Sequence, residues 1–216
     1  MLTLRPDLPG NRPLRILCLG AHADDLEIGC GGTIMHLVRS RPVECTWVVL
    51  SGTPERHAEA RAGAEAVTAG AVGRSVRLEQ FRDGFFPAVW SELKECFEGL
   101  KSVQPDLVLT HRRDDRHQDH RTVAELTWNT WRDHVILEYE IPKYEGDLGH
   151  PSLYVPLDRD LVDRKVEILL ASFGTQRSRH WFDADTFRAL MRLRGLECAS
   201  PSGYAEAFHA PKVVLA

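Results

Sequence analysis

A histidine and three carboxylates occur within six residues directly after an apolar run. The stretch GAHADDLEIGCGG, residues 20–32, follows LRILCL and contains His22, Asp24, Asp25 and Glu27. Carboxylates are costly to bury unless a positive group meets them, and hydrolytic zinc sites use sets of three histidine or acidic ligands with one position open for water. Because Asp24 and Asp25 are neighbours, their side chains point in different directions, so that one can bind an ion while the other acts as a base. The stretch therefore predicts part of a metal site.

A second polar cluster, THRRDDRHQDH at residues 110–120, follows another apolar run and supplies further histidines. His117 and His120 are three residues apart at the start of an expected helix, and residues so spaced share a face. One of them can bind the ion while the other stands over a substrate. His22, one aspartate and His120 would complete a set of two histidines and one aspartate, similar in type to the set of zinc peptidases.

The elements that must position these clusters alternate between strands and helices. Strands are expected at residues 15–22, 43–51, 74–79, 106–111 and 135–141. Helices are expected at residues 31–41, 55–70, 88–103, 120–134, 159–172 and 184–195. This rhythm predicts βαβ units and therefore an α/β, Rossmann-like fold, with a mainly parallel sheet and helices on both faces.

The chain is interpreted as one domain over residues 1–216, with a core at about 14–141 and a C-terminal elaboration at 142–216. The later part is turn-rich, and its last strand-like piece is PKVVLA, residues 211–216. In open parallel sheets, ligands bind beyond the carboxyl ends of strands. The two polar clusters follow the first and fourth expected strands, so we expect them to meet at one edge of the sheet.

Composition narrows the class of protein. The 216 residues are 43% hydrophobic and 27% charged, which suits a globular core, and the net charge of −4 gives no general attraction to nucleic acid or anionic membranes. Prolines break the first fifteen residues before the apolar core of a signal peptide forms, and no apolar run approaches the ~20 residues that span a bilayer. Five scattered cysteines without a CxxC pair indicate reduced thiols. These features predict a cytoplasmic protein without nucleic-acid or membrane partners.

Other interpretations of the same residues stay open. Gly29, Gly31 and Gly32 follow a strand as in dinucleotide-binding proteins, but the GxGxxG spacing places Ile34 where the third glycine should be. Close packing is the simpler use of these glycines. Glu27 either contacts a ligating residue or caps the following helix. The arginines of the second cluster could suggest nucleic-acid binding, but alternating acidic residues cancel their charge.

Several short motifs of this chain occur together in one known family. AHADDLEIGCGGT resembles the first motif, H-P-D-D-x-E, of the PIG-L/LmbE-like zinc-dependent de-N-acetylases, and DRHQDH resembles their H-x-D-H motif. RHAEARAGAEAV resembles the Arg-x-x-Glu-Ala helix of the family, and YAEAF, residues 204–208, its C-terminal tyrosine motif. The chain departs from the usual pattern at Ala23, where proline is commoner, and at Asp114, where asparagine is frequent.

The resemblance implies roles for individual residues at the reacting centre. It implies that His22, Asp25 and His120 bind Zn²⁺, or another divalent transition metal. Asp24 corresponds to the general base, and His117 to the histidine that stabilises the oxyanion and donates a proton.

Further residues would support this centre. The resemblance implies that Arg56 and Tyr204 contact the substrate, and that Asp115 and Asp119 orient the imidazoles of the metal ligands. Asp83, Phe85 and Lys143 are candidate contacts from the loops expected to shape the pocket.

The expected activity is therefore zinc-dependent removal of an acetyl group from the N-acetyl amine of a small soluble substrate, with release of acetate. The resemblance is greatest to small bacterial members that act on N-acetylglucosamine-type sugars and on the bacillithiol precursor, and it implies a homo-oligomer. The alternatives are a metal-dependent hydrolase of a different amide, such as a non-sugar natural-product intermediate, and a nucleotide-binding oxidoreductase.

Overall fold

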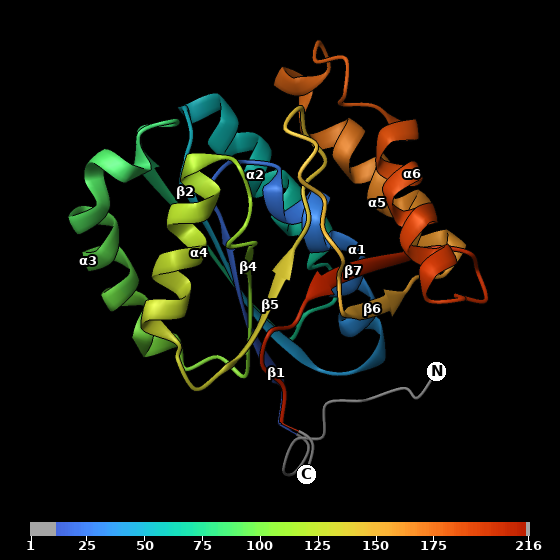
Figure 1. The fold of residues 1–216 in the computed structure, drawn as a ribbon, viewed down its shortest axis with the longest axis horizontal. Helices are drawn as coiled ribbons and strands as arrows, with labels where there is room; N and C mark the ends of the chain where they lie inside the picture. Colours follow the sequence, from blue (N-terminus) through green and yellow to red (C-terminus); the bar gives the residue numbers. More distant parts are fainter. Residues whose placement is uncertain (1–11, 215–216) are drawn as a thin grey trace.

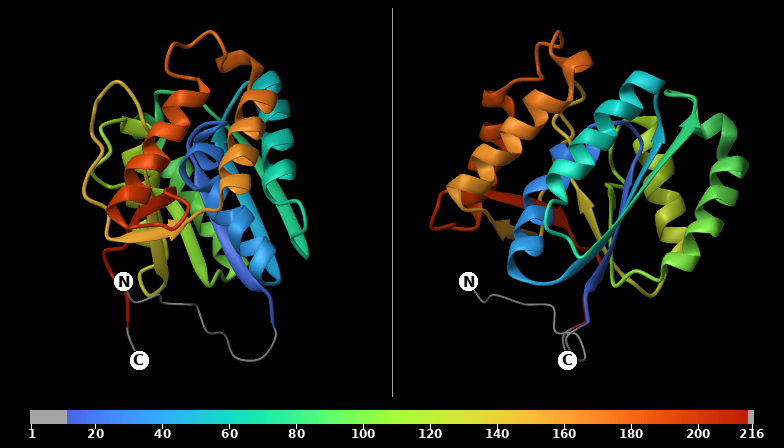
Figure 2. Two further views of the ribbon diagram at one scale, coloured as in Figure 1. Left: turned by 90° about the vertical axis from the view of Figure 1, so that its right-hand side faces the viewer. Right: turned by 180° about the vertical axis from the view of Figure 1, so that it is seen from behind.

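The computed structural model describes residues 12–214, in which seven strands form one sheet covered by helices on both faces (Figures 1 and 2). The spatial order of the strands is β3-β2-β1-β4-β5-β7-β6. Strands β1 to β5 pair in parallel, whereas β7 is antiparallel to both β5 and β6. The predicted α/β fold with a mainly parallel sheet is confirmed. The strands are β1 (Leu14–Gly20), β2 (Val43–Ser51), β3 (Gly73–Phe81), β4 (Leu107–His111), β5 (Val135–Tyr139), β6 (Leu153–Pro156) and β7 (Ala205–His209).

Six α-helices are described over the same residues: α1 (Asp25–Ser40), α2 (Pro54–Val67), α3 (Trp90–Leu100), α4 (Gln118–Thr130), α5 (Arg159–Ser172) and α6 (Ala184–Glu197). Helices α3 and α4 cover one face of the sheet, and α1, α2, α5 and α6 cover the other (Figure 2). Short 3-10 turns flank α3 on both sides, so the expected helix over 88–103 is helical throughout but α-helical only in its middle.

The pleat of β1 divides the hydrophobic core into two layers. Ile16 and Cys18 belong to the core cluster under α1 and α2, whereas Leu17 and Leu19 belong to the cluster under α3 and α4. Successive side chains of a strand point to opposite faces, so a strand covered on both sides needs an unbroken apolar run. This is why LRILCL predicts a central strand, and β1 lies between β2 and β4.

The C-terminal third differs from expectation at the edge of the sheet. The last strand is β7 rather than PKVVLA, of which residues 211–214 form no strand and residues 215–216 lie outside the described part. Phe208 of β7 is fully buried, and β7 pairs with β5 and with β6, a short strand that sequence patterning missed. Residues after 142 thus extend the main sheet itself.

Helix α1 begins earlier than expected, at Asp25 instead of after the glycines. A Cβ atom at Gly29 would overlap the ring of Tyr139, which is buried and donates its hydroxyl to the carbonyl oxygen of Leu19 at 2.8 Å. The glycine lets α1 approach β5 this closely. The glycine-rich run is therefore part of a tightly packed helix in the described structure.

Gly63 of α2 offers a test of this close packing. A Cβ there would collide with Glu27 Oε1 and lie 3.0 Å from Cζ of Phe173, both buried. We expect Gly63→Ala to lower the free energy of unfolding by about 1–3 kcal/mol, because overpacking outweighs the better helix propensity of alanine. Gly99→Ala in α3, where nothing lies within 4 Å of the added Cβ, is the matched control and should be neutral or stabilising by up to about 1 kcal/mol. Denaturant unfolding of both variants measures this, and equal effects would contradict the packing.

Within residues 12–214, none of the helices is both long and apolar enough to cross a membrane. The five cysteines are free thiols, and four of them are buried. Cys18 and Cys45 lie on the adjacent strands β1 and β2, with 3.7 Å between their sulfur atoms. Both therefore serve as small buried core residues.

Candidate active site

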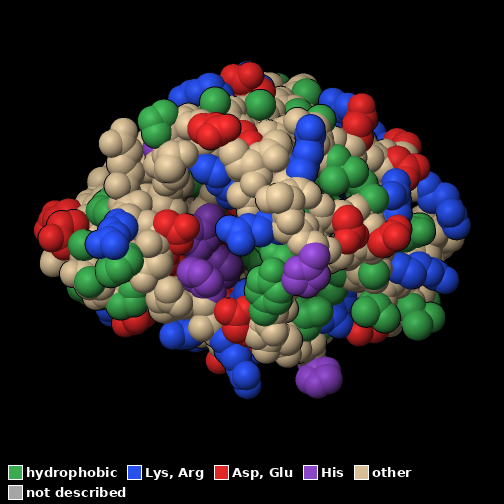
Figure 3. All heavy atoms as spheres, turned by 90° about the horizontal axis from the view of Figure 1, so that it is seen from above, with side chains coloured by type: hydrophobic (Ala, Val, Ile, Leu, Met, Phe, Trp, Pro, Cys, Tyr) green, Lys and Arg blue, Asp and Glu red, His purple; other side chains and the backbone are tan. Residues whose placement is uncertain are grey.

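The two polar clusters meet at the carboxyl ends of β1 and β4, which are neighbours in the sheet. The chain leaves β1 toward β2 and β3, and leaves β4 toward β5 on the other side, so this is the position where the strand order reverses. Viewed onto this edge, histidine side chains gather in a hollow of the surface (Figure 3). The loops after β1 and β4 therefore meet, as expected.

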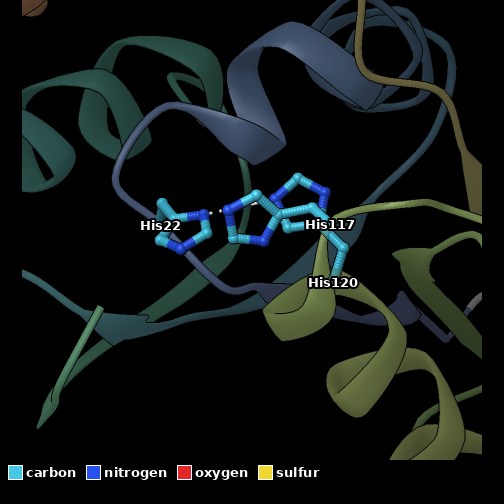
Figure 4. Close-up of side chains that lie close together, drawn as sticks. All are labelled: His22, His117 and His120. Carbon is cyan, nitrogen blue, oxygen red and sulfur yellow. Dashed lines mark hydrogen bonds between the residues drawn. The ribbon is translucent and has the colours of Figure 1, made fainter. Parts of the chain in front are cut away.

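The three predicted metal ligands face one another. His22 comes from the loop after β1 and His120 from the first turn of α4 (Figure 4), and His22 Nδ1 lies 3.2 Å from His120 Nε2. His120 Nε2 is 3.6 Å from Asp25 Oδ1, and His22 Nδ1 is 3.5 Å from Asp25 Oδ2. Ligand atoms about 2.0–2.1 Å from a tetrahedral zinc ion lie about 3.3 Å apart. The two histidine nitrogens have the spacing that such an ion requires, and each of them lies close to one oxygen of Asp25.

Three other groups of possible ligands overlap this set: His22, His117 and His120; Asp25, His111 and His120; and His22, Asp83 and Asp119. The second is excluded by ring geometry. The rings of His111 and His120 stack with centroids 3.9 Å apart and planes inclined by only 17°. A metal must lie close to the plane of each imidazole that binds it, and two nearly parallel, stacked planes do not meet at one ion. The rings of His22 and His120 are inclined by 48°, which permits a shared ion.

The protonation states of His120 and His22 suit a site that binds a cation. Burial lowers the pKa of His120 to about 4, and the nearby His111 adds to this shift, so that His120 is neutral and able to bind metal at pH 7. Burial opposes the charged form of His22, but bonds to Asp119, Asp25 and Asp83 outweigh it and raise its pKa well above the usual range. Without metal, a proton on His22 supplies the positive charge that these carboxylates require.

Asp115 and Asp119 lie against the imidazoles of His120 and His22, where the resemblance predicts carboxylates that orient the ligands. Asp115 Oδ2 lies 3.0 Å from His120 Nδ1 and also accepts from Lys143 Nζ at 2.8 Å. Asp119 Oδ2 lies 3.3 Å from His22 Nε2 and accepts the backbone N–H of Gly84 at 2.6 Å. Carboxylates at the outer nitrogen of a ligating histidine set the ring orientation and raise its basicity.

The loop residues considered as substrate contacts have different positions. Lys143 is tied to Asp115 and, at 2.8 Å, to Asp147, so it supports the site instead of reaching into it. Asp83 is 76% exposed and lies 3.1 Å from His22 Nε2 at the mouth of the site. Phe85 is exposed, with the guanidinium of Arg82 over its ring. Asp83 and Phe85 are therefore accessible to a ligand.

Asp24, the predicted base, is buried beside Asp25 and His22. It has a positive φ of 151°, which is unusual for a residue other than glycine and is often found at functional sites. Burial raises the pKa of Asp24 to about 7; Arg56 opposes this shift and Asp25 adds to it. A carboxylate with a pKa near 7 is able to take up a proton at neutral pH.

The guanidinium of Arg56, predicted to contact substrate, is held by several hydrogen bonds within the protein. Its guanidinium donates to Asp24 Oδ1 at 3.0 Å, to the carbonyl oxygen of Ala23 at 2.6 Å and to Thr175 Oγ1 at 3.1 Å, and it is 17% exposed. These bonds join the loop after β1 to the turn after α5. In the described structure Arg56 holds Asp24 in place, and a contact with substrate stays a prediction.

His117 is the residue that caps the N-terminus of α4. Its Nδ1 accepts the backbone N–H of Asp119 at 3.2 Å, so in the neutral ring the proton is on Nε2. Burial lowers the pKa of His117, and the charge of His22 lowers it further, so the ring is neutral at pH 7 in the metal-free chain. The ring of His117 lies 4.9 Å from that of His22, which places an N–H donor beside the ligand set.

Tyr204 is not brought to this cluster. It lies directly before β7, where Arg159 of α5 and Arg192 of α6 stand over its ring at 5.6 and 5.9 Å. None of the hydrogen bonds or ring contacts described for it reaches the histidines. The reason is topological, since β7 pairs with β5 only at Phe208 and His209, and its beginning, next to Tyr204, extends past β5 and packs against α6. Its implied contact with substrate is unsupported in this conformation.

Glu27 lies in the first turn of α1, near the helix N-terminus as one of its two expected roles requires, but it is not the capping residue. Its carboxyl group is 1% exposed, its Oε1 has no hydrogen-bond partner among the described residues, and it faces Gly63 of α2. The helix-capping position belongs to Asp24. Burial raises the pKa of Glu27 well above the usual range, with Asp24 and Asp25 contributing, which keeps it in the uncharged form.

His111 was missed by sequence reasoning. It is the last residue of β4, is fully buried, and has its Nε2 3.1 Å from Asp25 Oδ2. A signal existed, because a polar residue at the carboxyl end of a parallel strand occupies a functional position. In the sequence, His111 is visible only as the end of an apolar run.

An α/β sheet that holds two histidines and an aspartate at its switch point, with a second aspartate beside them, has the arrangement of a metal-dependent hydrolase. The family profile described as GlcNAc-PI de-N-acetylase, PIG-L, matches residues 17–131, more than half of the chain. The chain therefore belongs to the PIG-L family, and its enzyme class is that of the metal-dependent de-N-acetylases.

Solved structures with the same fold agree over nearly the whole chain. A conserved protein of Thermus thermophilus has a TM-score of 0.74 at 23% identity, covering 94% of this chain and 97% of that one. The N,N'-diacetylchitobiose deacetylase of Pyrococcus horikoshii has a TM-score of 0.71 at 20% identity, covering 90% and 82%. The 4-carboxy-2-hydroxymuconate hydratase of Pseudomonas putida has a TM-score of 0.75 at 18% identity, covering 94% and 98%. These likenesses establish a shared fold.

Proposed function

We propose that this protein is a zinc-dependent hydrolase that removes the acetyl group from the N-acetyl amine of a small soluble substrate. An N-acetylglucosamine-containing sugar or conjugate is the proposed substrate class. The observation that carries the proposal is the convergence of His22, Asp25 and His120 at spacings that suit a tetrahedral ion, with Asp24 beside them. The diacetylchitobiose deacetylase with the same fold supports the choice of an acetylated amino sugar.

The proposed chemistry is addition of water to an acetamide, followed by cleavage of the carbon–nitrogen bond. A divalent ion bound to the ligand set would act as a Lewis acid toward the carbonyl oxygen and lower the pKa of water. Asp24, with its raised pKa, takes a proton from the attacking water. His117 Nε2–H donates a hydrogen bond to the oxygen that becomes negative. The proton taken by Asp24 is the one the nitrogen needs in order to leave as an amine, and the other product is acetate.

A different reaction on the same fold is the main competing proposal. The Pseudomonas putida neighbour is a hydratase, and adding water to a carbon–carbon double bond can use the same base and ion. Hydrolysis of another amide, such as a non-sugar natural-product intermediate, is a second alternative. A nucleotide-binding oxidoreductase is opposed by charge, because the buried carboxylates of Asp24 and Asp25 lie at the N-terminus of α1, where a pyrophosphate would have to bind.

An acetate-release assay distinguishes these proposals. The chain is stripped with chelator, reloaded separately with Zn²⁺, Co²⁺ or Mn²⁺, and incubated with N-acetylglucosamine, N,N'-diacetylchitobiose and an N-acetylated amino acid. We expect equimolar acetate and free amine from the sugars, only in the reloaded protein, and slower release from the amino acid. Release from the amino acid alone would overturn the sugar assignment, and no release from any acetamide would overturn deacetylation. Water addition to an unsaturated dicarboxylate would favour the hydratase.

The setting of the reaction is a further proposal. We infer a cytoplasmic homo-oligomer that acts on a small molecule without a nucleic-acid or membrane partner. The net charge of −4 and the scattered reduced cysteines support this setting. These statements stay predictions from the sequence.

A further inference from the structure

The geometry points to His111 as a positioning residue of the proposed metal centre: we propose that its buried ring, which accepts the backbone N–H of Ala21 and lies against Asp25 and His120, holds these two ligands in place. This inference rests on the proposed metal site and assigns a role to a residue that the motifs leave out. His111 does not itself bind the ion, because its ring stacks on that of His120. Its contribution is to act through the two ligands that it touches.

The two oxygens of Asp25 have different surroundings. Oδ2 accepts the backbone N–H of His22 at 2.7 Å and lies 3.1 Å from His111 Nε2. Oδ1 is the oxygen that lies 3.6 Å from His120 Nε2, on the side of the ligand set. The N–H of His22 and the neighbouring ring of His111 hold the carboxylate on its Oδ2 side, which leaves Oδ1 on the side of His120.

The hydrogen bond of His111 ties two segments together. The backbone N–H of Ala21 donates to His111 Nε2 at 3.0 Å, so this nitrogen is an acceptor. Nδ1 is buried without a partner among the described residues. Because Ala21 directly precedes His22 and lies just before Asp25, the bond fixes the loop after β1 against the end of β4.

The ring itself is held rigidly from both sides. It packs against Tyr139 with centroids 4.8 Å apart, and its strand position is opposite Tyr139 in the β4–β5 register. On its other face it stacks on His120. A side chain locked by packing in this way can transmit a fixed geometry to two ligands at once.

Three variants test the inference. His111→Phe keeps a buried ring against His120 and removes the acceptor of the Ala21 N–H, whereas His111→Gln can restore an acceptor near the position of Nε2. Thr110→Val is the control, because Thr110 is the adjacent buried residue of β4 and its hydroxyl bonds only Thr127 Oγ1 at 2.9 Å, away from the ligands. The dissociation constants for Zn²⁺ and Co²⁺ are measured by chelator competition, and the stability of each metal-free chain by denaturant unfolding.

We expect His111→Phe to weaken metal binding by about 10–100-fold, the usual effect of losing a group that orients a ligand. His111→Gln should recover most of that loss, and Thr110→Val should bind metal as the unaltered chain does, even if it is less stable. Unchanged affinity in His111→Phe, or equal losses in His111→Phe and Thr110→Val, would overturn the role of His111 while leaving the metal centre intact. An unaltered chain that takes up no divalent ion would overturn both proposals.

Discussion

Replacing Asp24 by asparagine is expected to leave the bound metal in place and to lower kcat by about 10²–10⁴-fold, the range of general acid–base catalysis. Asparagine keeps the size of the side chain and an oxygen that can accept from Arg56, but it cannot take up a proton. The aspartate is suited to that task because burial raises its pKa to about 7 against the opposing charge of Arg56. Metal content by elemental analysis and kcat from acetate release, measured on the same preparation, check both parts.

The control for this variant is Asp114→Asn, whose carboxylate is 83% exposed and makes only a 3.6 Å pair with Arg112. It removes one charge from the same edge of the sheet without touching the ligand set, so its kcat should stay within about twofold. If Asp24→Asn keeps near-normal turnover, Asp24 is not the base. If it loses the metal as well, Asp24 is part of the ligand set.

Removing the imidazole of His120 is expected to abolish stoichiometric metal binding. His120 is neutral at pH 7 because burial lowers its pKa to about 4, and its Nε2 lies 3.2 Å from His22 Nδ1 and 3.6 Å from Asp25 Oδ1. We expect His120→Ala to weaken Zn²⁺ binding by more than the roughly 10–100-fold typical of groups that only orient ligands, with loss of acetate release. Chelator competition and elemental analysis measure the effect.

His134→Ala is the matched histidine control, because its ring pairs with Asp133 at 2.8 Å next to β5 and has no part in the ligand groups. Its metal affinity should equal that of the unaltered chain. A His120→Ala protein that still binds one tightly held ion would show that another set, such as one built on His117, holds the metal. Comparing Zn²⁺ with Co²⁺ then distinguishes a change of ligands from a general loss of structure.

Much of the fold was predictable because it depends on local patterns. The apolar run at β1 and the alternation of strand-like and helix-like segments indicate a buried parallel sheet, and that sheet places the ends of β1 and β4 together. Strands β6 and β7 were not predictable in the same way. They are short antiparallel strands whose residues are selected by the pairing of β7 with β5, by the pairing of β6 with β7, and by the burial of Phe208.

The sequence by itself determined the donor chemistry of the site, because the spacing of HADD and HQDH supplies imidazoles and carboxylates at the ends of two strands. Only the tertiary structure decided how the side chains divide their tasks. It ties Arg56 to Asp24, directs Lys143 to Asp115, turns Tyr204 toward α5 and α6, and brings His111 behind Asp25. The physical reason is that ligand identity is encoded in residues close along the chain. Orientation, in contrast, depends on hydrogen bonds and ring contacts between residues that strand pairing brings together from distant segments.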